Sequence, residues 1–215
     1  MQNNNQKQTA FFGKITAGIT HEINNVLAII KESSGLIEDI ANISTVVSDK
    51  YQEKFFNSLS TIKGQLKRGT ELVNNLNRFA HIPDNIYAKI DLYEAVKQII
   101  VLASRSARLK NITLEIDPPE ATKDTANVEA NPIMLLLVLF TAVEYCMEYI
   151  PQGGNIIIAP QKLQDKKIVF LKAMGDSSES KPAPEKLSDL TEVVTFLKGS
   201  LETDDSSSNL TLIFS

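Results

Sequence analysis

The sequence predicts an α+β protein: a long antiparallel helical hairpin followed by an α/β sandwich. Apolar residues recur at steps of three and four from Phe12 to about Ile43, and again from Phe55 to Ala80. Pro83 ends the second pattern because proline lacks the N–H that continues a helical hydrogen-bond ladder. Beyond it, helical patterns alternate with short strand-like runs. We therefore assign residues 1–83 to the hairpin and residues 84–215 to the α/β domain.

Composition narrows the function classes. The 215 residues are 43% hydrophobic and 22% charged, the ordinary mix of a globular protein. A net charge of -4 gives no broad basic surface, so nucleic acid is not an expected partner. The longest apolar run, Ile133 to Phe140, is too short to span a bilayer, and no signal peptide opens the chain; we expect no membrane partner and a cytoplasmic protein. One cysteine and two histidines argue against an internal disulfide and a metal centre.

The hairpin carries a narrow apolar seam. In the first helix Ile19, Ile23, Val26 and Ile30 fall within one sector. Two helices cannot enclose such a seam alone, so we expect a homodimer with a four-helix bundle; packing on the second half of the chain is the alternative. Gly69, in the second stripe, either permits close helix approach or only weakens the helix.

The second half predicts helices on one face of a mostly antiparallel or mixed sheet. Asn131 and Pro132 read as the cap and first turn of a very apolar helix that extends to Tyr149. The other expected helices are 91–110 and 187–197, and the expected strands are 112–116, a short one at Val128, 155–159, 167–173, 201–202 and 210–214.

His21 is the main candidate for chemistry. At about 100° per residue it lies roughly 200° from Ile19, on the water-facing side of the first helix. Asn25, four residues on, shares its face, and small side chains border it. An exposed neutral imidazole is a competent nucleophile near neutral pH. The alternative is an ordinary surface histidine. The other histidine, His81, is expected to be structural at a helix end, and Cys146 to be core.

The stretch from His21 to Ile30, HEINNVLAII, resembles the phosphoacceptor box of two-component sensor histidine kinases. By this resemblance the hairpin is a dimerisation and histidine-phosphotransfer domain. Residues 91–118 are similar to the opening of the kinase ATP-binding domain, and residues 131–158 to the helix that carries its asparagine box and the strand that follows.

The resemblance assigns roles to three residues. His21 matches the phosphorylated histidine, and Glu22 the adjacent acid that assists transfer. Asn25 matches the polar residue that positions water in members with phosphatase activity. Val26 stands where the family has proline, so the helix kink is expected to be absent or differently made.

The nucleotide-binding elements depart from the family pattern. Leu137 and Thr141 replace the two asparagines of the first box, and leucine cannot ligate magnesium, which requires oxygen. Ala173 replaces the aspartate that recognises adenine, and Asp176 could take its role only after a register slip. No glycine lies between Gly175 and Gly199 to form the phosphate-cradling loop.

We therefore expect a histidine phosphotransferase of a phosphorelay. His21 would shuttle phosphoryl groups between receiver-domain aspartates of response regulators, without ATP. No cofactor is expected on this chain, because the receiver would bring its own magnesium. The alternatives are a histidine kinase, or a fragment of one, with a divergent nucleotide site, and a receiver-binding phosphatase or adaptor.

Overall fold

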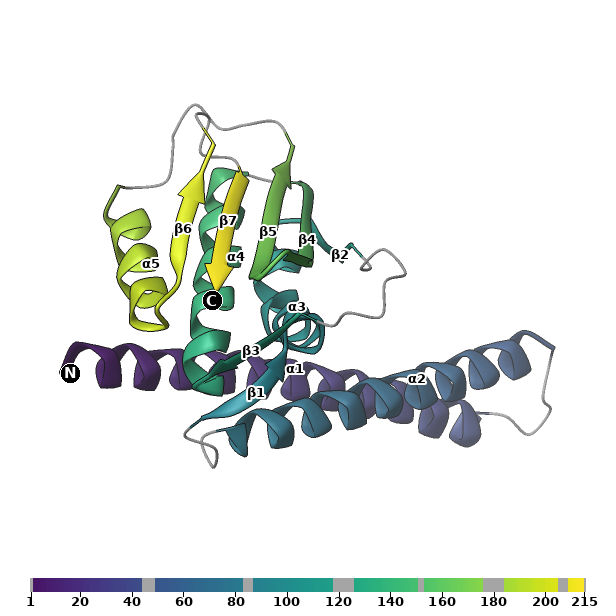
Figure 1. Ribbon diagram of the computed structural model, residues 1–215. Coiled ribbons are helices and arrows are strands. Elements are labelled where there is room, and N and C mark those ends of the chain that lie inside the picture. Colours follow the sequence, from purple (N-terminus) through teal and green to yellow (C-terminus); the bar gives the residue numbers. More distant parts are fainter. Residues whose placement is uncertain are drawn as a thin grey trace. The chain divides into compact units, whose positions relative to one another are not determined.

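The computed structural model describes residues 2–43, 49–82, 87–117, 126–150, 153–175, 184–204 and 209–214. Its contacts divide the chain into two compact units, Gly13–His81 and a second unit that joins Met1–Phe12 to Ile82–Ser215 (Figure 1). The first is helical and the second combines helices with a mixed sheet. The predicted α+β class is confirmed.

The helical unit is a hairpin of two long helices. Helix α1 spans Gln2–Ile43 and α2 spans Asp49–Ala80, as the apolar periodicity predicts. The seam differs in register from the prediction: Glu22 is 4% exposed, whereas Ile23 is only half-buried. From Ile15 to Val26 the buried residues of α1 follow one another at steps of three and four, with Glu22 among them. The other buried side chains of this unit are Ile40, Ser58 and Phe79.

A second apolar stripe lies beside the seam and stays exposed. Leu27 is 57% exposed on α1, and Leu66 and Val73 are 54% and 52% exposed on α2. At about 100° per residue, Leu66 and Val73 are only about 20° apart around α2. The single hairpin therefore leaves part of its apolar surface uncovered.

The second unit is built on a five-stranded mixed sheet in the order β2-β4-β5-β7-β6. Strands β2 and β4 are parallel and the other neighbours are antiparallel. The helices gather on one face of the sheet, where α4 packs against β4 and β5 and contacts both α3 and α5 (Figure 1). The bounds are α3 Leu92–Leu109, α4 Pro132–Tyr149, α5 Pro184–Phe196, β2 Ile112–Ile116, β4 Gly154–Leu163, β5 Lys166–Met174, β6 Ser200–Thr203 and β7 Asn209–Phe214.

A two-stranded sheet accompanies α3. Strand β1, Ala88–Asp91, pairs antiparallel with β3, Asn127–Ala130. The predicted strand at Val128 is confirmed, whereas β1 was not predicted. Asp91 ends β1 and caps α3, its carboxylate accepting a hydrogen bond from the Tyr93 N–H at 2.8 Å.

Helix α4 is the core helix of this unit. It is long and apolar enough to cross a membrane, but 72% of it is buried inside the protein, as in the central helix of a folded core. The predicted cap is confirmed: the Asn131 side chain accepts from the Met134 N–H at 3.0 Å, and Pro132 stands in the first turn. Burial raises the pKa of the Cys146 thiol to about 12.

The first residues of α1 belong by their contacts to this α/β unit. Lys7 Nζ donates to Asp189 at 3.2 Å and Glu192 at 2.6 Å, both on α5. The Phe11 ring lies 5.2 Å from that of Phe140 on α4. Burial alone would lower the pKa of Lys7, but the hydrogen bonds to the two carboxylates outweigh it and the pKa is raised.

Candidate functional site

The candidate phosphoacceptor, His21, lies on α1 within the hairpin unit. Its side chain is exposed, on the side of the helix that the angular argument predicts. His81 directly follows α2, where its backbone N–H donates to the Asn77 carbonyl at 3.2 Å. Of the two histidines, His21 is the one carried on an exposed face within a long helix.

Asn25 lies against the His21 ring. Its Nδ2 is 3.2 Å from His21 Nδ1, one helical turn along the same face. In this arrangement the Asn25 Nδ2–H donates and His21 Nδ1 accepts, which places the ring proton on Nε2. If the amide turns over, its Oδ1 accepts from an Nδ1–H instead, and the lone pair is then on Nε2. The contact occupies Nδ1 and leaves Nε2, the nitrogen farther from the backbone, as the ring atom that a reactant would meet.

Glu22 does not lie beside the His21 ring. Its side chain is buried in the hairpin and pairs with the Arg68 guanidinium on α2, which is 39% exposed. Consecutive residues of a helix point about 100° apart, so Glu22 faces the seam while His21 faces water. The structure therefore brings together His21 and Asn25, but not Glu22.

Arg68 was not singled out from the sequence. The sequence carries no signal for it, because Arg68 directly precedes Gly69 of the predicted stripe and points about 100° away from that stripe. Gly69 itself permits close approach: a Cβ there would lie 3.1 Å from Val26 Cγ1. Val26, in the place of the family's proline, stands within a helix continuous from Gln2 to Ile43.

Among the described positions that match the nucleotide contacts, Leu137 and Ala173 have apolar side chains and Thr141 has a hydroxyl. Leu137 is only 7% exposed, and the Thr141 hydroxyl donates to the Leu137 carbonyl at 2.8 Å. Ala173 lies in β5 opposite Ile156 of β4. Asp176 lies outside the described residues. Within the described ranges, no group of three or more His, Cys, Asp or Glu side chains could hold a metal ion.

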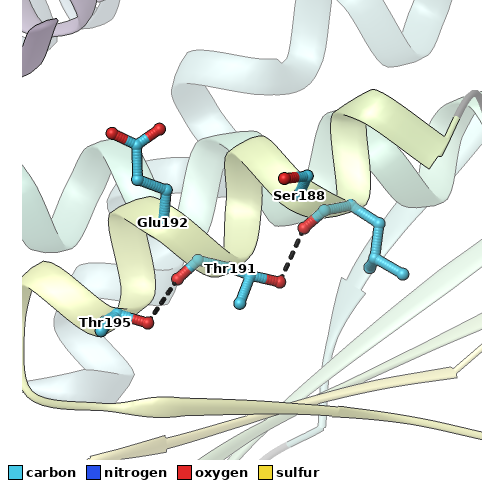
Figure 2. A pocket seen from close by; sticks show the side chains of 5 residues that line it. Ser188, Thr191, Glu192 and Thr195 are labelled. Carbon is cyan, nitrogen blue, oxygen red and sulfur yellow. Dashed lines mark hydrogen bonds between the residues drawn. The ribbon is translucent and has the colours of Figure 1, made fainter.

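A shallow depression of about 620 Å³ lies along α5 (Figure 2). Two of the three hydroxyls that line it donate to carbonyls of the same helix: Thr191 to that of Leu187, and Thr195 to that of Thr191, each at 2.7 Å. Glu192, on the same helix, is paired with Lys7. The depression therefore offers no set of polar groups that converge on a ligand.

The comparisons with known proteins point to histidine kinases. No protein-family model matches the chain. Sporulation kinase E of Bacillus subtilis (strain 168) is 26% identical over 164 residues, which cover 76% of this chain and 20% of that protein. The chain thus spans about a fifth of the length of this relative.

Solved structures of histidine kinases also match. Acinetobacter baumannii AdeS has a TM-score of 0.47 at 15% identity, covering 91% of this chain and 97% of AdeS. The catalytic domain of ThkA gives 0.46 at 20% identity over 59% of this chain and 92% of the domain. ThkA in complex with the response regulator TrrA gives 0.46 at 19% identity over 97% of this chain and 62% of the match. With TM-scores below 0.5, these matches do not bear on residue roles or on function.

The chain resembles the core of a two-component histidine kinase. That resemblance, predicted from the residues around His21, is confirmed by the similarity to sporulation kinase E. By sequence, the chain is therefore similar to part of a histidine kinase.

Proposed function

We propose that this protein is a histidine phosphotransferase that carries phosphoryl groups between receiver-domain aspartates through His21, without using ATP. The observation that carries the proposal is the exposed His21 ring held by Asn25, in a chain that places Leu137 and Thr141 where the family has magnesium-binding asparagines. Transfer between a histidine and an aspartate requires mainly positioning and charge neutralisation.

The transfer step needs only groups that this chain and a receiver can supply. The Nε2 lone pair of His21 attacks the phosphorus of the receiver's aspartyl phosphate, and a P–N bond forms. The P–O bond to the aspartate breaks, and its electron pair leaves with the carboxylate. The reacting ring carries its proton on Nδ1, with the Asn25 amide turned so that its oxygen accepts, and it releases that proton to solvent water. The receiver's magnesium neutralises the phosphoryl oxygens, so no metal on this chain is required.

We also propose that the protein works as a homodimer. The exposed apolar stripe that includes Leu27, Leu66 and Val73 supports this, because a second hairpin packed against it would complete a four-helix bundle. A response-regulator receiver would then approach the outward face that carries His21.

The decisive experiment mixes the protein with phosphorylated receiver domains and follows the label. Wild type and a His81→Gln control should become labelled, whereas His21→Gln should not. The label on the wild-type protein should be stable to base and labile to acid, as a phosphoramidate is. Labelling of His21→Gln, or no labelling of wild type by any receiver that binds it, would refute the proposal.

A histidine kinase is the second candidate, favoured by the similarity to sporulation kinase E. It predicts saturable binding of magnesium–ATP and labelling of His21 by ATP alone. The phosphotransferase predicts neither. If Asn25→Ala slows dephosphorylation of a receiver while His21→Gln preserves much of it, the chain is a phosphatase. A receiver adaptor would bind and do neither reaction.

A further inference from the structure

We propose that Arg68 is a positioning residue: it holds the Glu22 carboxylate in the seam of the hairpin, away from His21, and so limits how readily His21 accepts a phosphoryl group. The inference rests on the proposed phosphotransfer function, because it assigns a regulating contact to that site. It concerns a residue that the resemblance does not assign.

The burial of the pair indicates that Glu22 is held in place. The Glu22 side chain is 6% exposed, whereas that of its partner Arg68 is 39% exposed. Removing one member of a buried ion pair is strongly unfavourable because it leaves the other charge without its counter-charge. While Arg68 is paired with Glu22, the ion pair therefore stabilises Glu22 in the seam. Asn25 is then the residue that contacts the His21 ring.

A second acceptor for Arg68 lies on its own helix. Gln65 Oε1 is buried and has no hydrogen-bond partner among the described residues. Residues three apart on a helix are neighbours, so the Arg68 guanidinium, with five N–H donors, can reach for this oxygen. A turn of Arg68 toward Gln65 would satisfy the buried oxygen and release Glu22. The same three side chains would then form a second arrangement, with Arg68 bonded to Gln65 in place of Glu22.

Release of Glu22 would change which nitrogen of His21 carries the proton. A carboxylate only accepts hydrogen bonds, so beside the ring it selects the form with a proton on Nδ1 and a lone pair on Nε2. The Asn25 amide serves either form. When Nε2 then attacks phosphorus and the aspartate leaves, the Nδ1 proton passes to Glu22. Glu22 thus favours the reactive form of the His21 ring and accepts the Nδ1 proton, but only when it is not paired with Arg68.

The test compares Arg68→Met with Arg78→Met, a matched change at an exposed arginine of the same helix. Nitrogen-15 NMR of the His21 ring, recorded at about pH 8.5 where an ordinary imidazole is neutral, reports the two proton positions without any receiver. We expect Arg68→Met to raise the fraction with the proton on Nδ1, and Arg78→Met to leave it unchanged. The His81→Gln background leaves a single histidine and makes the signal unambiguous.

The rate of phosphoryl acceptance supplies the second readout. Arg68→Met should accelerate labelling of His21 by roughly tenfold, below the range of about 10² to 10⁴ that a positioned acid or base contributes. The same substitution in a Glu22→Gln background should change neither rate nor proton position, and Arg68→Lys should behave as wild type. A merely structural Arg68 would leave the proton position unchanged, and the rate unchanged or lower; that result overturns the inference. If wild type accepts no phosphate, the proposed function fails, while the NMR comparison still decides the role of Arg68.

Discussion

The contact between Gly69 and Val26 predicts how the two helices respond to one added methyl group. In Gly69→Ala the new Cβ would lie 3.1 Å from Val26 Cγ1, inside the separation of about 3.5–4.0 Å that two carbon atoms prefer. Val26 cannot easily turn away, because a β-branched side chain in a helix has one strongly preferred rotamer. The backbones must therefore separate, or the methyl group must remain strained.

The expected magnitude follows from two opposing effects. Replacing glycine by alanine inside a helix stabilises by about 1 kcal/mol, and overpacking a tight contact costs about 1–3 kcal/mol. Gly69→Ala should therefore lower the free energy of unfolding by about 0–2 kcal/mol. Gly64, on the same helix, is the matched control: nothing lies within 4 Å of its Cβ position, so Gly64→Ala should stabilise by about 0.5–1 kcal/mol.

Denaturant unfolding followed by circular dichroism measures both variants, at one protein concentration because association would shift the midpoint. Val26→Ala should cost less in the Gly69→Ala background than in the wild type, because there it also removes the atom that the new methyl group meets. Equal stabilisation by the two glycine substitutions would refute the reasoning, because it would mean that the helices are not in close contact at this level.

Further predictions concern the α/β unit. Asn131→Ala removes the cap of α4 and should cost about 1 kcal/mol in thermal or denaturant unfolding. Leu137→Asn buries an amide in place of an apolar side chain and should cost about 3 kcal/mol, rather than restore magnesium–ATP binding, which calorimetry would detect. Cys146, with its raised pKa and full burial, should resist iodoacetamide at pH 8 and react fully in guanidinium. Lys7→Met should cost less than about 1 kcal/mol, because its acidic partners are exposed. The raised pKa of Lys7 means that its contribution is present below the lysine range and lost as pH rises through it, and salt should weaken it as well.

The long helices could be predicted from sequence because their periodicity is local, but the seam register could not be predicted in full. Hydrophobicity alone favours Ile23 over Glu22 as a buried residue. The structure buries Glu22 because Arg68, on the facing helix, supplies a counter-charge. That compensation depends on a residue 46 positions away along the chain, which no helical pattern within α1 reveals.

The small sheet was missed for a similar reason. Strand β1 is four residues long and directly precedes the cap of α3, so its sequence reads as part of the helix start. Its partner β3 follows only after α3 and β2, and pairing between such distant segments leaves little local signal. The polar first residues were equally uninformative, since Lys7 acquires its role from carboxylates on α5.

In the candidate site, too, only the features that depend on a single helix could be predicted from the sequence. An exposed face is local information, so the orientation of His21 and its neighbour Asn25 could be predicted from helix geometry. The place of Glu22 depends on the opposite helix and could not.

The departures at the nucleotide-matching positions have a structural consequence as well as a chemical one. Leu137, at 7% exposure, is part of the core that α4 shares with the sheet, and burying a leucine stabilises by about 1.5–3 kcal/mol. An asparagine there would need water or a bound ion to satisfy its amide.

Leu137 therefore removes an oxygen ligand and at the same time adds an apolar side chain to the core. Under the proposed function, the α/β unit does not hold magnesium and gains stability from a leucine at that position, whereas His21 must stay exposed to reach a receiver. On this argument, stability favours a buried side chain at position 137, whereas phosphotransfer requires an exposed one at position 21. Leu137→Asn should therefore affect mainly stability, and His21→Gln only transfer.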